Sequence, residues 1–236
     1  MNKILWATGF NNTYYTQVFQ KVKHSWNLLP GDVHFYTDES IADLTHDVRA
    51  MSSGIDLSKC PTNLSRKESK FWKKSLCIAT AVRASLGKYD YCIWLDADVT
   101  VTKTPDILSV LPTGDELLSV NNKIVTSFDS TQRNAIDIGL DTGFLAINLH
   151  HPNLVEWLEQ YENIWNTTEM NSMLRKYDTY TLELILKKNN YNYKNLWHGV
   201  HTSGKHYCGF EDSDLAHYFF HHWGKKRKRI LEGSVI

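Results

Sequence analysis

The stretch YCIWLDADV, residues 91–99, is an apolar run that ends in two carboxylates. On the strand expected over residues 89–99, Ile93 and Leu95 share one face and Cys92 and Trp94 share the other. A strand that is apolar on both faces is typical of a parallel sheet whose two sides are both covered. This feature therefore predicts an α/β fold, in which helices flank a mostly parallel central sheet.

The two acidic residues need a reason to follow such a strand, because an ionised carboxylate is costly to bury unless it is paired or binds a cation. Asp96 and Asp98 come directly after the apolar run. Ligands of open α/β sheets bind beyond the carboxyl ends of the strands, and residues two apart on an extended backbone point the same way. The pair therefore suits a hard divalent cation, Mn2+ or Mg2+. The alternative is an acidic turn or a helix N-cap that binds nothing.

The rest of the pattern predicts one α/β domain over residues 1–236, with a basic C-terminal tail from about residue 217. Residues 3–8, 13–27 and 32–39 read as strand, helix and strand, which is a βαβ unit. We expect residues 121–140 to form a loop. The further elements expected, in chain order, are a strand near 48–51, helices at 68–86 and 106–111, strands at 116–120 and 142–149, helices at 153–165 and 177–188, and a strand near 193–197.

Composition argues against several classes of protein. Lys plus Arg and Asp plus Glu both number 26, so no overall positive field recruits nucleic acid. The 4 cysteines have no close spacing, which argues against a disulfide framework and a zinc site. No apolar run approaches the roughly 20 residues of a membrane span, and the N-terminus lacks a signal-peptide pattern. We therefore expect a cytoplasmic protein of a bacterium, or of the host cytoplasm if the chain is phage-encoded.

The tail carries a second polar motif, HHWGKKRKR, over residues 221–229. The neutral imidazole of His221 can bind a metal, and Gly224 lets the backbone approach an anion closely. Arg227 and its basic neighbours can neutralise phosphate, with the guanidinium doing so in a forked geometry. A solvated basic tail or a patch for nucleic acid is the alternative for a charge run of this kind.

Together these motifs resemble the metal-dependent glycosyltransferases of the GT-A fold. The chain is similar to the family of glycogenin and the bacterial lipo-oligosaccharide galactosyltransferases, and to fungal and plant galactosyl- and xylosyltransferases. In those families an Asp-x-Asp motif holds Mn2+ on the diphosphate of a nucleotide-sugar, and a late His-x-x-Gly-x-x-Lys/Arg motif completes the site. The resemblance implies that Asp96, Asp98 and His221 bind the cation. It also implies that Gly224 and Arg227 contact the diphosphate.

Further matches imply the residues that bind the donor. The first strand and the loop after it resemble the segment that holds the nucleoside, which implicates Thr8 and Tyr14. Lys74 stands at about the place of a basic residue near the donor, and Ala97 lies inside the Asp-x-Asp motif. The donor-binding residues implied by the resemblance are Thr8, Tyr14, Lys74, Asp96, Ala97, Thr142, Gly143, Gly224 and Arg227.

Two segments resemble those that surround the reacting sugar. In DTGFLAINL, the resemblance implies that Asp141, Thr142 and Gly143 face the donor sugar. In YDTYTLELILK, Asp178 matches the family's Asp, but Thr179 stands where the family has Gln. Thr is shorter than Gln, so the position of the sugar or the identity of the catalytic partner differs here. The catalytic residues implied are Asp178, Thr179 and Asp141.

Three of these residues also have purely structural interpretations. Asp141 could cap the end of a strand, and Asp178 suits the N-cap of the helix that follows it. Tyr14 could simply pack on the helix beside it.

The implied reaction is transfer of a hexose or pentose from a nucleotide-sugar, a UDP-sugar first of all, to a hydroxyl acceptor with retention of anomeric configuration. The acceptor is a glycan, a lipid-linked sugar or lipopolysaccharide, or a hydroxymethylated DNA base. One alternative is a nucleotidyltransferase, although TGFNNTYY lacks the basic, glycine-rich first loop of that class. Another is a non-catalytic nucleic-acid-binding protein that uses the basic stretches 66–74 and 225–229. The sequence does not indicate an oligomeric state.

Overall fold

The computed structural model describes residues 2–38, 50–124, 138–172, 176–198, 210 and 213–222. Within these ranges, a seven-stranded sheet has the strand order β3-β2-β1-β4-β7-β6-β8, and a two-stranded sheet pairs β5 with β9. The strands are β1 (Ile4–Phe10), β2 (Asp32–Thr37), β3 (Ala50–Gly54), β4 (Tyr91–Leu95), β5 (Val99–Val101), β6 (Leu118–Ile124), β7 (Ile138–Asn148), β8 (Tyr193–Asn195) and β9 (Phe219–His221).

The helices lie between these strands along the chain. The α-helices are α1 (Asn12–Tyr14), α2 (Gln20–Val22), α3 (Arg66–Ser85), α4 (Ile107–Val110), α5 (Leu154–Asn163), α6 (Thr168–Ser172) and α7 (Asp178–Asn189). A π-helical turn covers Tyr15–Phe19, and 3-10 turns cover Lys23–Leu28, Leu57–Lys59, Ile164–Asn166 and Asp214–His217.

The sheet is mostly parallel, as predicted. Strand β1 runs parallel to β2 and β4, β2 runs parallel to β3, and β6 runs parallel to β8. Strand β7 runs antiparallel to both of its neighbours, β4 and β6. Its register pairs Leu95 with Phe144, and the N–H of Asp96 donates to the carbonyl of Gly143 at 2.8 Å. The reversed direction of β7 therefore places residues 141–143 beside the acidic motif at the carboxyl end of β4.

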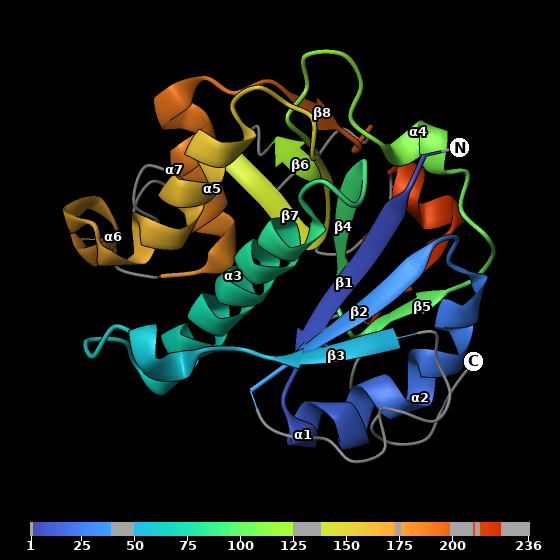
Figure 1. Ribbon diagram of the computed structural model, residues 1–236, viewed down its shortest axis with the longest axis horizontal. Helices are drawn as coiled ribbons and strands as arrows, with labels where there is room; N and C mark the ends of the chain where they lie inside the picture. Colours follow the sequence, from blue (N-terminus) through green and yellow to red (C-terminus); the bar gives the residue numbers. More distant parts are fainter. Residues whose placement is uncertain are drawn as a thin grey trace.

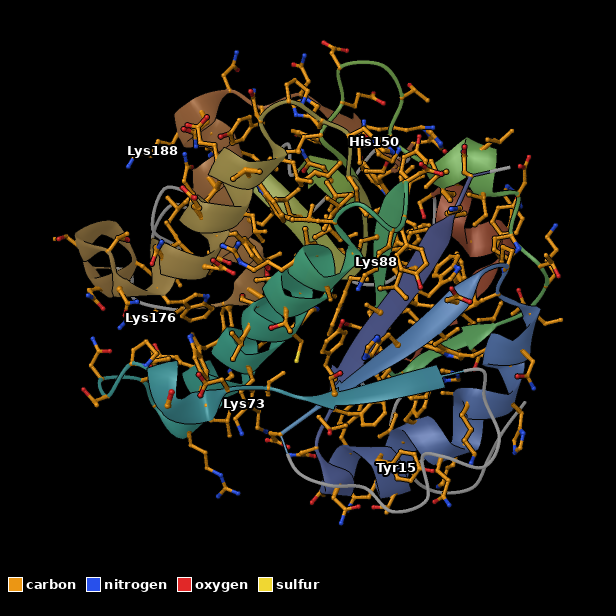
Figure 2. The ribbon with its side chains drawn as sticks, in the orientation of Figure 1. Tyr15, Lys73, Lys88, His150, Lys176 and Lys188 are labelled. Atoms are coloured by element: carbon orange, nitrogen blue, oxygen red, sulfur yellow. The ribbon has the colours of Figure 1, made fainter. Side chains whose placement is uncertain are left out.

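Helices cover both faces of the sheet, as Figure 1 shows. Helices α3, α5 and α7 pack over one face, and the helical segment of residues 12–28 packs over the other. Figure 2 adds the side chains to this view and labels Lys73 on α3 and Tyr15 on the helical segment of residues 12–28. Cys92 and Trp94 belong to the first core, and Ile93 and Leu95 belong to the second. All four are at most 2% exposed, which confirms the prediction of a central strand buried on both sides.

Helix α3 is fixed firmly at both ends, and it carries Lys74 to the site. The Ser65 hydroxyl accepts from the N–H of Glu68, whose carboxylate accepts from the N–H of Ser65, which forms a capping box. Gly87 follows the helix with φ of +71°, a left-handed conformation that glycine adopts at no steric cost.

Some element boundaries differ from those predicted. The first helical segment is divided into short α, π and 3-10 parts rather than one helix, and β3 begins at Ala50. Strand β6 extends to Ile124 and β7 begins at Ile138, so both enter the stretch that was expected to be a loop. The rest of that stretch lies outside the described residues. Among the described residues, no helix is both long and apolar enough to cross a membrane.

Candidate metal centre

Asp96, Asp98 and His221 meet at the carboxyl end of β4. Each offers one ligand atom, and these atoms all lie within 4.8 Å of one another. Asp98 is 1% exposed and His221 is 6% exposed. Strand pairing brings the histidine there, because Val99 of β5 is opposite His221 of β9 and the N–H of His222 donates to the carbonyl of Asp98 at 3.0 Å. The structure thus brings the three predicted metal ligands together.

The two carboxylates converge for a reason other than the one predicted. The chain does not stay extended after β4, because the N–H of Val99 donates to the carbonyl of Asp96 at 3.1 Å and closes a turn. Both side chains still reach the same histidine: Nε2 of His221 lies 3.3 Å from Oδ1 of Asp98 and 3.9 Å from Oδ2 of Asp96. A turn that re-aims Asp98, rather than period-two alternation, therefore forms the acidic pair.

The donor set fits a divalent cation. Neither ring nitrogen of His221 makes an aligned hydrogen bond to any described residue, although both are buried, and a buried polar atom without a partner is uncommon. The ring stacks on Phe210 at 4.9 Å between centroids. Burial by itself would lower the pKa of His221, but the carboxylates of Asp98, Asp141 and Asp96 outweigh it and raise that pKa. Two carboxylates and an imidazole are ligands that suit a divalent metal ion.

Gly143 makes room for this cluster. A Cβ atom at that position would lie 2.7 Å from Cε1 of His221 and 3.0 Å from Oδ1 of Asp141. The same Oδ1 accepts from the N–H of Gly143 at 2.9 Å. Any side chain at position 143 would therefore push the histidine away from the carboxylates.

A network next to the cluster joins α3, β7 and α7. Nζ of Lys74 lies 2.8 Å from Oδ1 of Asp96 and 2.9 Å from Oδ2 of Asp178. It also donates to Oγ1 of Thr142 at 3.2 Å, and the Thr142 hydroxyl donates to Asp178. Burial favours neutral Lys74, but the two carboxylates outweigh it and raise the lysine pKa. Burial raises the pKa of Asp96, against the opposing effect of Lys74.

These contacts show that Asp178 is not the N-cap of the helix that follows it. The N-cap of α7 is Tyr177, and Asp178 stands in the first turn of the helix. The carboxylate of Asp178 accepts from Thr142 and pairs with Lys74 instead of capping. Asp141 likewise lies inside β7 rather than at its end, next to a register shift between Val120 and Asn121.

The other predicted residues are placed as follows. Thr8 is fully buried near the carboxyl end of β1, and its hydroxyl oxygen has no hydrogen-bond partner among the described residues. Tyr14 is half-buried in α1 and packs partly against the core. Ala97 is 4% exposed between the two acidic residues, and Thr179 is half-buried in α7. Gly224 and Arg227 lie outside the described residues.

The hydrogen bond of Trp94 to the acidic motif was not predicted from the sequence. The indole N–H of Trp94 donates to Oδ1 of Asp96 at 2.8 Å. The signal that could have indicated it was the spacing, because residues two apart along a strand share a face.

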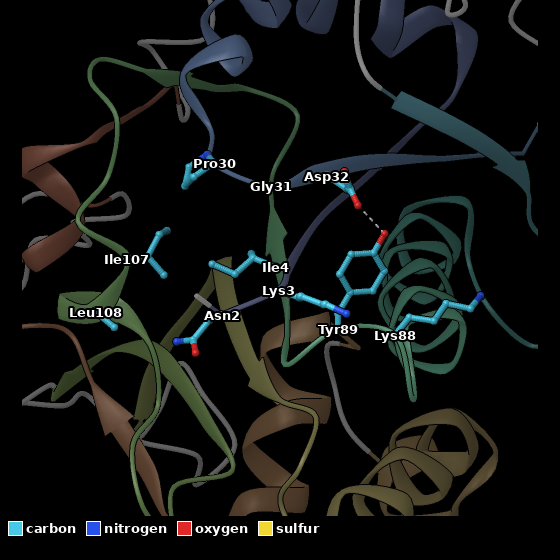
Figure 3. Close-up of a pocket in the computed structure, with 10 residues that line it drawn as sticks. All are labelled: Asn2, Lys3, Ile4, Pro30, Gly31, Asp32, Lys88, Tyr89, Ile107 and Leu108. Carbon is cyan, nitrogen blue, oxygen red and sulfur yellow. Dashed lines mark hydrogen bonds between the residues drawn. The ribbon is translucent and has the colours of Figure 1, made fainter.

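A pocket of about 810 Å³ lies elsewhere, and Figure 3 shows its lining. Ile4 and Asp32 begin β1 and β2, and Leu108 comes from α4. The hydroxyl of Tyr89 donates to Asp32 at 2.8 Å across one side of it. Because β1 and β4 are parallel, this pocket lies at the end of the sheet opposite the acidic cluster.

Comparison with known proteins rests on structure. No protein-family model matches the sequence, and no curated protein matches it. A glycosyltransferase involved in glycosylation of the major capsid of PBCV-1 matches with a TM-score of 0.59 and 15% identity, over 99% of this chain and 100% of that chain. The glycosyltransferase GlyE of Streptococcus pneumoniae TIGR4 matches with a TM-score of 0.52 and 13% identity, over 83% of this chain and 45% of that chain.

At these identities the matches show a shared fold. The chain spans about the whole of the first structure and less than half of the second. The fold is therefore that of the GT-A-like glycosyltransferases, as the sequence motifs predicted. A cluster of two aspartates and a histidine lies at the carboxyl end of its central strand.

Proposed function

We propose that this chain is a metal-dependent glycosyltransferase that moves a hexose or pentose from a nucleotide-sugar to a hydroxyl acceptor. The observation that carries the proposal is the cluster of half-buried Asp96 with buried Asp98 and His221 in a glycosyltransferase fold. The predicted motifs favour a UDP-sugar as donor and Mn2+, or Mg2+, as the cation. We further propose that the whole chain forms one domain and acts in the cytoplasm.

The reaction breaks the bond between the anomeric carbon and the diphosphate, so negative charge grows on the leaving group. A bound divalent cation supplies the positive charge that stabilises this leaving group. Asp96, Asp98 and His221 would hold the cation, and Lys74 adds fixed positive charge 2.8 Å from Asp96. Gly224 and Arg227, which lie outside the described residues, are proposed to contact the diphosphate.

The donor sugar is proposed to lie over β7 and the start of α7. Asp141 and Asp178 would accept hydrogen bonds from its hydroxyl groups, and Lys74 and Thr142 hold the carboxylate of Asp178 through an ion pair and a hydrogen bond. Thr8 and Tyr14 would hold the nucleoside, as the resemblance implies.

Retention of configuration is proposed from the resemblance. Thr179 takes the place of the family's Gln and reaches less far, so we propose that another group lies near the reacting carbon. Proton NMR of the product anomer tests the stereochemistry, and an inverted linkage would contradict this part of the mechanism.

Two classes of acceptor are proposed, a glycan or lipid-linked sugar and a hydroxymethylated DNA base. A basic surface favours a polyanionic acceptor, and the exposed N-terminal part of α3 contributes Arg66, Lys67 and Lys70. Mass spectrometry of nucleosides and of surface glycans from cells that express the chain distinguishes the two classes.

A thermal-shift screen tests the function itself. UDP-sugars should raise the melting temperature when Mn2+ is present and have little effect without it, because the cation links the diphosphate to the protein. Stabilisation by nucleoside triphosphates alone would favour a nucleotidyltransferase instead. Stabilisation by DNA alone would favour a nucleic-acid-binding protein.

A further inference from the structure

The side chain of Trp94 makes a specific contact with one oxygen of the acidic motif. Its indole N–H donates to Oδ1 of Asp96 at 2.8 Å, and Trp94 is 2% exposed on β4. An indole has a single donor and no acceptor, so this one bond uses the whole hydrogen-bonding capacity of the side chain.

The two oxygens of Asp96 are consequently divided between two tasks. Oδ1 accepts from Trp94 and pairs with Nζ of Lys74 at 2.8 Å. Oδ2 lies 3.9 Å from Nε2 of His221. Since a carboxylate oxygen has about two lone pairs, Oδ1 is fully engaged by protein donors, and Oδ2 is the oxygen that faces the cluster.

The indole is held rigidly while it makes this bond. Its six-membered ring lies close to the backbone of β1, because a Cβ atom added at Gly9 would lie 3.1 Å from Cη2 of Trp94. The same added atom would lie 2.7 Å from Sγ of Cys77, so there is little free space around the ring. A packed ring cannot rotate away, so the direction of its N–H is set by the core.

We infer that Trp94 is a positioning residue, which fixes Asp96 as a ligand through Oδ2 alone. The inference rests on the proposed function, because it assigns a role at the same cation site. Trp94 acts through Asp96 and touches no substrate, so its removal should weaken cation binding first. Partners that orient a metal ligand typically change metal affinity by about tenfold to a hundredfold.

The chain offers matched controls. Trp157 and Trp165 are 0% and 1% exposed in the same core as Trp94. Their indole nitrogens have no hydrogen-bond partner among the described residues. Trp157→Phe and Trp165→Phe therefore remove the same ring atoms as Trp94→Phe without removing a hydrogen bond.

The test is a titration of the whole chain with Mn2+ alone, with free Mn2+ followed by electron paramagnetic resonance. Trp94→Phe should bind Mn2+ about tenfold to a hundredfold more weakly, and both control variants should bind like the unmutated chain. As a second variant, replacing Trp94 with 3-benzothienylalanine keeps the ring shape and removes only the N–H. It should weaken binding as Trp94→Phe does.

The outcomes separate this inference from the proposed function. If the unmutated chain binds Mn2+ and both Trp94 variants bind equally well, the inference is wrong and the proposed function stands. Equal weakening in Trp165→Phe would also overturn it, since the effect would then come from a loosened core. If the unmutated chain binds no Mn2+, the proposed cation site and this inference both fail.

Discussion

Gly143 and His221 approach so closely that a Cβ atom on the glycine would lie 2.7 Å from Cε1 of the imidazole. The first belongs to β7 and the second to β9, two strands of different sheets. Their close approach is what lets the histidine lie against the acidic residues at the end of β4. The absence of a side chain at position 143 is thus a condition for the cluster.

Gly143→Ala should weaken Mn2+ binding by about tenfold or more, because the methyl group displaces a residue of the cluster. The measurement is Mn2+ affinity at fixed temperature, together with the melting temperature of the metal-free protein. Gly54→Ala is the control, since a Cβ atom there meets nothing within 4 Å. Unchanged affinity in Gly143→Ala would show that the approach of the two strands does not hold His221 in place.

Lys74→Met should destabilise the metal-free protein by about 3 kcal/mol, because removing one member of a buried ion pair leaves the other charge uncompensated. The lysine pairs with Asp96 and Asp178 at 2.8 and 2.9 Å. Urea unfolding in the presence of chelator gives the change in free energy.

Two further variants check this explanation. Lys70→Met changes an exposed lysine of the same helix, and it should leave stability nearly unchanged. Adding Asp178→Asn to Lys74→Met should recover part of the loss, because one of the unpaired charges is then removed. If the double variant is less stable than Lys74→Met alone, charge pairing is not the cause.

Stability should also depend on the protonation of His34. This residue is 9% exposed, its ring stacks on Tyr36, and its Nε2 lies 3.0 Å from Oγ of Ser53. Burial, with a smaller effect from Lys88, lowers the pKa of His34 from its ordinary value of 6.5. The folded state therefore binds fewer protons at this group than the unfolded state.

It follows that this contribution to stability is complete above about pH 6.5 and is lost as the pH falls toward the lowered folded pKa. The free energy of unfolding of the unmutated chain should thus fall more between about pH 7.5 and about pH 5 than that of His34→Gln. His24→Gln, a change at an exposed histidine, is the control for the comparison. Parallel pH profiles for the unmutated chain and His34→Gln would contradict the prediction.

Local patterns were sufficient to predict much of the fold. The apolar run of β4 is buried on both faces because every side chain in it is apolar. The first strand, helical segment and second strand form the predicted parallel unit, since their periodicities are distinct. Asp96, Asp98 and His221 were predicted as one site because their motifs resemble those of a family, and the structure brings them together.

Contacts between distant residues were not predictable in this way. The sequence indicated Lys74 and Asp178 separately, but not that the lysine joins Asp178 to Asp96. That contact depends on how α3 and α7 pack on the sheet. The turn that aims Asp98 was not predicted either. An extended strand would also have placed Asp96 and Asp98 on one side, so the pattern did not indicate that a turn was needed.

The central claim is that Asp96, Asp98 and His221 hold a cation that this chain uses to transfer a sugar. The most direct measurement is release of UDP from a panel of UDP-sugars, with Mn2+ and with chelator, by the unmutated chain, Asp98→Asn and Asp90→Asn. Asp90 pairs with His150 before the start of β4, at the end opposite the cluster, and serves as the control. We predict release that requires Mn2+, falls about a hundredfold or more in Asp98→Asn and is unchanged in Asp90→Asn. Release by the unmutated chain that persists in chelator would contradict the account.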